Sequence, residues 1–116
     1  MSLTDWSDAI TIAELSPEPE FSEDMGNLIG KVEERQESGE KSPDVILNLA
    51  EVEYLNSSNI AQLLRLRKRL TAMGARLRIC SVGDQVWGVI LVTGLDKLFD
   101  FHPDVATAIA SLQIEA

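Results

Sequence analysis

The chain has 116 residues, a net charge of −9 and a mean hydropathy of +0.01, values typical of one globular domain with a single modest core. The acidic balance argues against direct nucleic-acid binding, because neutralising phosphates requires a cationic surface. No window approaches the roughly 20 apolar residues of a membrane span, and the first residues lack the pattern of a secretory signal. The single cysteine, Cys80, excludes an internal disulfide framework, so we expect a cytoplasmic protein with a buried strand thiol.

The first half of the chain predicts a strand, a helix and a second strand. Apolar residues alternate over 10–15, which favours a strand, and residues 1–8 before it are a candidate flexible N-terminus. Two prolines within 16–20 indicate an extended loop. Ser22 is then a candidate N-cap for a helix that ends near 36–39, and the apolar run 45–49 is typical of a strand covered on both faces.

The second half continues the same alternation. An amphipathic helix ends at Gly74, and a strand follows over 76–82. Asp84 is a candidate cap for a short helix that closes at 93–95, and Leu98 with Phe99 predicts a last short strand. A C-terminal helix begins near Pro103. Alternating strands and helices imply an α/β fold: one domain over 1–116, with a four- or five-stranded mixed, largely parallel sheet and about four helices packed on it.

Basic residues are concentrated in one stretch of the chain. Six of the ten lie within 65–78, and no acidic residue occurs between Tyr54 and Asp84; the six are Arg65, Arg67, Lys68, Arg69, Arg76 and Arg78. A solvated helix face beside acidic neighbours explains this pattern. The alternative is a docking surface for an acidic partner.

Four small polar residues, Asn56, Ser57, Ser58 and Asn59, lie between the second predicted strand and the amphipathic helix. Helix capping explains them in part, since a side-chain oxygen at this position stabilises a helix start by about 1 kcal/mol relative to alanine. A cap needs only one such side chain, however. The second interpretation is a hydroxyl that is modified, because the helix dipole favours an added phosphoryl group there.

No pattern predicts catalysis or a cofactor. The single histidine, His102, precedes a proline in a predicted loop, and no Cys/His spacing suits a metal ion. A glycine-rich phosphate loop is also missing. Trp6 and Trp87 are expected to pack in the core or at its edge, and the alternative is that they are partly exposed contact residues. We therefore expect a protein that is not an enzyme and has no metal or cofactor site.

The order of VILNLAEVEYL, NSSN, a basic amphipathic helix ending AMGARLRIC, and TGLDKLF resembles a STAS domain of the bacterial anti-sigma factor antagonist type. The family's signature after the strand is Asp-Ser-Ser-Gly, whose first serine is the phosphoacceptor. The resemblance therefore implies phosphorylation at Ser57, flanked by the partner-binding residues Asn56, Ser58 and Asn59. Which of the two serines is preferred stays open.

Three departures from the family pattern bear on function. Asn56 replaces the usual aspartate, Asn59 replaces the usual glycine, and the loop 16–21 has no Gly-Glu-Leu-Asp-like stretch. Loss of the aspartate removes a repulsion of order 1 kcal/mol from a phosphate nearby. The same loss slows phosphorylation if the carboxylate orients the hydroxyl, and the sequence does not rank the two effects. Asn59 adds bulk where the family keeps the surface bare.

The resemblance implies an anti-sigma factor antagonist in a partner-switching cascade. The unmodified form is expected to bind an anti-sigma factor of the serine-protein kinase type and so release the sigma factor, and Ser57 phosphorylation is the off switch. Alternatives are an accessory subunit of an ABC-type transporter, and a non-phosphorylated scaffold or nucleotide-binding module. Whether the protein forms a homodimer is open.

Overall fold

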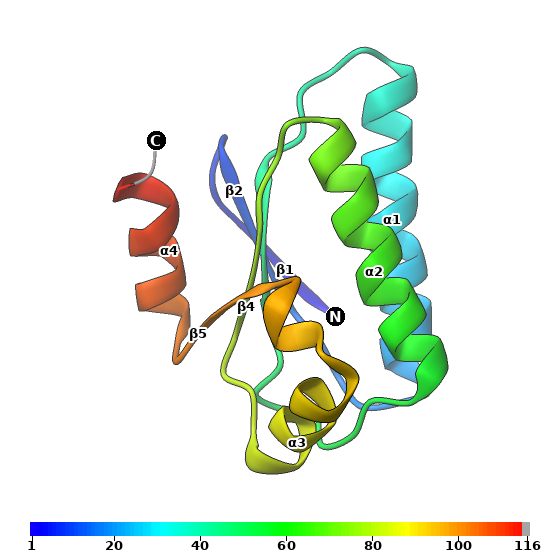
Figure 1. Ribbon diagram of the computed structural model, residues 1–116. Coiled ribbons are helices and arrows are strands. Elements are labelled where there is room, and N and C mark those ends of the chain that lie inside the picture. The colour runs from blue at the N-terminus through cyan, green and yellow to red at the C-terminus, as the bar shows by residue number, and fades with distance from the viewer. Residues whose placement is uncertain (115–116) are drawn as a thin grey trace.

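The computed structural model describes residues 1–114 and contains one five-stranded sheet with helices on both faces (Figure 1). The strands are β1 (Ser2–Ser7), β2 (Ile10–Glu14), β3 (Asp44–Asn48), β4 (Leu77–Cys80) and β5 (Asp100–His102). The helices are α1 (Glu20–Glu37), α2 (Ser57–Ala72), α3 (Asp84–Thr93), the short 3₁₀ helix η1 (Leu95–Lys97) and α4 (Val105–Ile114).

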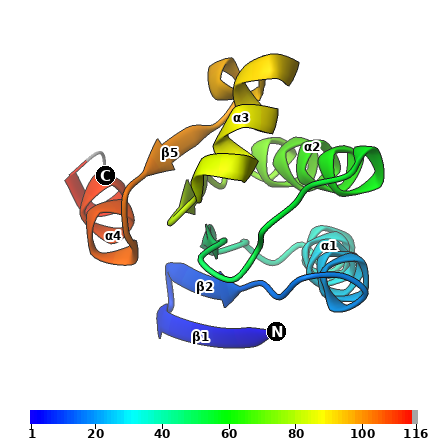
Figure 2. The same ribbon diagram turned by 90° about the horizontal axis from the view of Figure 1, so that it is seen from below.

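The strands lie in the sheet in the order of the sequence. β1 pairs antiparallel with β2, and every later pair, from β2–β3 to β4–β5, is parallel. Helices α1 and α2 lie side by side on one face, α4 covers the other face, and α3 lies at the end where the parallel strands finish (Figures 1 and 2). The predicted fold class, a small α/β domain with a mixed and largely parallel sheet, is confirmed.

Two hydrophobic clusters lie on the two faces of the sheet. The larger cluster joins α1 and α2 to alternate strand residues, among them Ala13, Leu47 and Ile79. The smaller cluster joins α4 to the residues that point the other way, including Ile46 and Cys80. Cys80 is fully buried, as predicted, and burial raises the pKa of its thiol. Strands covered on both faces explain why 45–49 shows no alternation in the sequence.

Two predictions are wrong at the ends of the sheet. Residues 1–8 are predicted to be flexible, but Ser2–Ser7 form β1, because they pair with β2 and Leu3 packs against the larger cluster. The last strand begins at Asp100 and not at Leu98. Gly94, in left-handed conformation at φ 76°, ends α3 and is followed by the turn η1, so the chain becomes extended only after Phe99.

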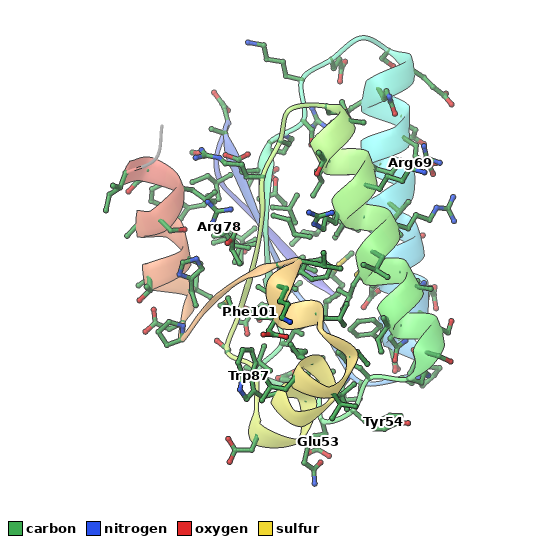
Figure 3. All side chains as sticks on the ribbon, in the orientation of Figure 1. Glu53, Tyr54, Arg69, Arg78, Trp87 and Phe101 are labelled. Carbon is green, nitrogen blue, oxygen red and sulfur yellow. The ribbon has the colours of Figure 1, made fainter. Side chains whose placement is uncertain are left out.

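The predicted basic cluster is divided between two sides of the molecule. Arg65 and Arg69 on α2 contact Glu33 of α1, at 3.6 and 3.1 Å, which confirms a helix face that pairs with acidic neighbours. Arg76 and Arg78 lie in and beside β4 and reach toward α4 (Figure 3). The six basic residues therefore do not form one docking surface.

Candidate functional site

The NSSN segment lies at the end of the molecule where the parallel strands finish. β3 ends at Asn48, and a connection of eight residues, 49–56, leads into α2. The connection is anchored by Val52 and Leu55, which are 4% and 2% exposed. Because two buried side chains hold it, the start of α2 has a fixed position relative to the sheet.

Asn56 and Asn59 close the start of α2 by a reciprocal pair of hydrogen bonds. The Asn59 N–H donates to Oδ1 of Asn56 at 2.8 Å, and the Asn56 N–H donates to Oδ1 of Asn59 at 3.1 Å. This arrangement is a capping box in which asparagine takes the place of the more common Glu or Gln at the third helical position. Asn59 was expected to add bulk to the surface, but it is 1% exposed and lies inside the corner. That expectation is wrong because the side chain turns back to the helix start.

A carboxylate from another part of the chain reaches this corner. The Nδ2 group of Asn59 donates to Oε2 of Glu18 at 3.3 Å, although the two residues are 41 positions apart. Glu18 in turn accepts from the N–H of Ser22 at 2.7 Å and from its hydroxyl at 2.6 Å. Gln62 adds a bond to the Ser22 carbonyl at 2.9 Å. The loop before α1 and the start of α2 are thus tied together by side chains.

Ser22, the predicted N-cap, lies inside α1, and Glu18 accepts the hydrogen bond from its N–H. Helix α1 begins at Glu20 with Pro19 at the N-cap position, and no side chain of the N-cap residue bonds to the helix. The side-chain and backbone hydrogen bonds from Ser22 lower the pKa of Glu18, and the amides of Asn59 and Asn56 act in the same direction. A carboxylate that is ionised at neutral pH thus lies beside the NSSN segment.

The predicted cap of α3 also differs from the structure, since Gly83 and not Asp84 is at the N-cap position.

The two serine hydroxyls are left exposed by this network. Ser57 is the first residue of α2 and Ser58 the second, and both side chains lie on the surface. Neither takes part in the capping box, which the two asparagines complete. The first turn of α2 contains no acidic residue, so its N–H groups and dipole favour an anion at this position. The corner thus presents hydroxyl groups that the fold itself does not use.

Among residues 1–114, no cluster of three His, Cys, Asp or Glu side chains is arranged to hold a metal ion. His102 and Cys80 are paired in register on neighbouring strands, where Cys80 is covered by α4. In the same part of the chain, no helix is both long and apolar enough to cross a membrane.

Two features of this end of the molecule were not predicted from the sequence. One is the bond between Glu18 and Asn59, which joins positions 41 apart and therefore has no local signal. The other is the exposure of Tyr54, which lies in the connection leading into α2 and is 68% exposed. Trp87, expected to pack at the core or its edge, contacts the edge of Phe101 with ring centres 5.2 Å apart and keeps 37% of its surface exposed (Figure 3).

A sequential five-stranded sheet with two helices on one face and a third on the other defines a class of small α/β domains. The STAS domain family model matches residues 17–108, and the chain belongs to this family. No curated protein matches the sequence closely enough to count as a relative.

Solved structures with low sequence identity share the fold. An anti-sigma-factor antagonist (STAS) domain protein from Planctomyces limnophilus is 20% identical, with a TM-score of 0.79 and 97% of each chain covered. An anti-sigma factor antagonist from Mycobacterium paratuberculosis is 19% identical, with a TM-score of 0.72 over 97% of this chain and 92% of the other. The phosphorylated Bacillus cell fate determinant SpoIIAA is 15% identical, with a TM-score of 0.68 over 96% of this chain and 97% of the other.

Proposed function

We propose that this protein is a cytoplasmic anti-sigma factor antagonist that works by partner switching. The unmodified form binds an anti-sigma factor of the serine-protein kinase type and so releases the sigma factor, and phosphorylation of Ser57 ends the binding. The observation that carries this proposal is the division of labour at the start of α2. Asn56 and Asn59 cap the helix, while the Ser57 hydroxyl is exposed and outside that network.

The fold accommodates a phosphoryl group at Ser57 with little rearrangement. The group adds about −1.5 to −2 charges at neutral pH, at a helix end where the dipole favours an anion. The capping box does not involve the hydroxyl, so the modification leaves both asparagine bonds in place. Phosphorylation therefore changes the surface of the protein and not its folded state.

A partner that is itself the kinase responds strongly to this change. To transfer the phosphoryl group, it must hold the Ser57 hydroxyl against the terminal phosphate of its nucleotide. After transfer, the phosphoserine faces the remaining nucleotide phosphates across a tightly packed contact. Like charges that are held together without water cost several kcal/mol, which is enough to end the association.

Glu18 modifies the effect of having Asn56 in place of the family's aspartate. The corner keeps an ionised carboxylate, but it comes from the loop before α1 and is held by Asn59 and Ser22. The second departure, Asn59 for glycine, supplies the amide that holds it. We infer that these two departures act together. Asn56 lacks the negative charge of the family's aspartate, and Asn59 holds the Glu18 carboxylate, which supplies a negative charge at the same corner.

Phosphorylation by the anti-sigma factor kinase from the same genome tests the proposal. The wild-type protein, Ser57→Ala and Ser58→Ala are incubated separately with the kinase and ATP, and the modified residue is identified by peptide mass spectrometry. We expect one phosphate on the wild type and on Ser58→Ala, and none on Ser57→Ala. An unmodified wild type, or equal labelling of Ser57→Ala, would overturn the switch and favour a permanently unmodified scaffold.

A further inference from the structure

A cavity of about 250 Å³ lies between the strand pair β1–β2 and the second half of α1, which is the helix on the β1–β2 side of the molecule (Figure 2). It is bounded by Asp5 and Thr11 on the strands and by Lys31 and Arg35 on the helix. We call it the β1–α1 cavity. It lies toward the end where the parallel strands begin, so it is separate from the NSSN segment, which follows the other end of β3.

The inner wall of the β1–α1 cavity is apolar. Leu28 and Val32 of α1 and Val45 of β3 are buried members of the larger cluster, and Leu3 of β1 packs against the same cluster. A closed apolar cavity of about 150 Å³ is large enough for benzene. The β1–α1 cavity therefore has room for an aromatic ring or a branched aliphatic chain that carries a small polar group.

Charged side chains of opposite sign face each other at the mouth of this cavity. On the strand side, the Thr11 hydroxyl donates to Oδ1 of Asp5 at 3.0 Å, and Thr11 is only 9% exposed, so the carboxylate has a fixed direction. On the helix side, Lys31 and Arg35 are one turn apart. In the part of the chain that the structure describes, neither of them forms an ion pair with Asp5, although all three line the cavity.

Arg35 has donors that its own contacts do not use. Its Nη1 donates to the Lys41 carbonyl at 3.2 Å and lies 3.7 Å from Oε2 of Glu40. The Arg35 and Glu40 side chains are 46% and 63% exposed, and exposed ion pairs contribute little free energy. Both contacts involve Nη1, so within residues 1–114 the Nε and Nη2 groups are left for a planar anion such as a carboxylate.

The strand side of the mouth favours a cation. A second cavity of about 300 Å³ shares Asp5, Thr11 and Arg35 with the first and adds Asp8, from the turn between β1 and β2. Two carboxylates thus lie on the strand side, and two basic side chains lie on the helix side. A ligand that satisfies both sides has a positive and a negative group close together, next to an apolar body.

We propose that the β1–α1 cavity binds a free amino acid with a large apolar side chain. The side chain of the ligand lies against the apolar wall, its ammonium group donates to Asp5, and its carboxylate accepts from Arg35 and Lys31. A simple carboxylic acid leaves Asp5 without a partner, and a simple amine leaves the two basic residues without one, which is unfavourable in a partly buried site. This inference goes beyond the proposed function and does not depend on it.

Isothermal titration of the full chain with four probes tests the chemistry of the ligand. The probes are L-phenylalanine, 3-phenylpropionate, which lacks the amine, phenethylamine, which lacks the carboxylate, and glycine, which lacks the apolar body. We expect L-phenylalanine to bind at least about tenfold more tightly than each of the other three, because each of them loses a charge-assisted hydrogen bond or the apolar contact. L-leucine and L-methionine extend the series to aliphatic side chains.

Matched variants test the residues of the site. Asp5→Asn keeps an oxygen for the Thr11 hydroxyl but loses the charge, and Arg35→Gln loses the guanidinium. Each should weaken L-phenylalanine binding by at least about tenfold. The same changes outside the cavity, Asp84→Asn and Arg65→Gln, should leave the affinity unchanged. All four positions are exposed, so the melting temperature should stay at the wild-type value.

Three results would overturn the inference. The first is that none of L-phenylalanine, L-leucine and L-methionine binds saturably. The second is that 3-phenylpropionate binds as tightly as L-phenylalanine, or that Asp5→Asn and Arg35→Gln bind like the wild type. The third is that the amide shifts caused by L-phenylalanine in an NMR titration lie at 56–59 and not at 3–11 and 28–35. Ser57→Ala should bind L-phenylalanine like the wild type, so a failure of the phosphorylation experiment leaves this inference standing.

Discussion

This protein has two polar networks, one at the Ser57 corner and one beneath α4. They contain similar hydrogen bonds but have different structural roles. At the corner, Glu18 and Asn59 are joined across 41 positions, and the hydroxyls next to them stay exposed. Beneath α4, the buried guanidinium of Arg78 bonds to Asp100 at 3.1 Å and to the Ser111 hydroxyl at 3.1 Å. The first network fixes the helix start but leaves the neighbouring hydroxyls outside its bonds. In the second network, the charged groups are themselves bonded and hold α4 on the sheet.

The difference shows why position in the sequence misleads for charged residues. Arg78 belongs to the dense basic stretch, yet its side chain is 6% exposed and bonds to Ser111 of α4. Arg76 also leaves that stretch, since it bonds to Asp44 at 2.9 Å and to the Leu112 carbonyl at 3.0 Å. These two arginines join α4 to the sheet. A charged residue indicates a docking surface only when its side chain remains in contact with water.

The largest stability effect is expected beneath α4. Arg78→Met removes the bonds to Asp100 and Ser111 and should lower the free energy of unfolding by about 2 kcal/mol, measured by urea denaturation. Lys68→Met, at an exposed position of α2, should change it by less than about 0.5 kcal/mol. Equal effects of the two variants would show that Arg78 does not hold α4.

A smaller effect is expected at the corner. Asn56→Ala removes the oxygen that accepts from the Asn59 N–H, so it should lower the free energy of unfolding by about 1 kcal/mol. Ser57→Ala and Ser58→Ala should each change it by less than about 0.5 kcal/mol, because neither hydroxyl belongs to the cap. If Ser57→Ala destabilised the protein as much as Asn56→Ala, the Ser57 hydroxyl would be needed for folding. The claim that only the asparagines cap α2 would then be wrong.

The smallest effect concerns the pH response of Glu18. Its pKa in the folded protein lies below the ordinary value of 4.5 because Ser22 bonds to the ionised form. The stabilisation is therefore fully present above pH 4.5 and is lost as the pH falls through the lower folded pKa. The Ser22 amide proton, followed by NMR, should titrate with a midpoint below 4.5, and this transition should vanish in Glu18→Gln. A midpoint at or above 4.5 would contradict the bonding at the corner.

The sequence predicted the elements whose signals are local. The apolar spacing of α2, the glycine at its end and the apolar run of β3 each depend on neighbouring residues, and all were located correctly within a few positions. The family resemblance added the fold and placed Ser57 at the start of α2, where the structure has it.

Features that depend on distant contacts could not be predicted. β1 forms because it pairs with β2 and covers the core with Leu3, although its own sequence is polar. The burial of Asn59 follows from the capping box and from Glu18, which lies in a loop with no strong local preference. The exposure of Val92 depends on which side of α3 faces the sheet. In each case, a tertiary contact decides the outcome.

The affinity of the anti-sigma factor kinase for the protein before and after phosphorylation of Ser57 tests the central claim most directly. Isothermal titration of the two forms, with Ser57→Ala as the form that cannot be modified, gives both dissociation constants. Binding of the phosphorylated form should be weaker by at least about 100-fold, and Ser57→Ala should bind like the unmodified protein. Equal dissociation constants for the phosphorylated and unmodified forms would contradict the account.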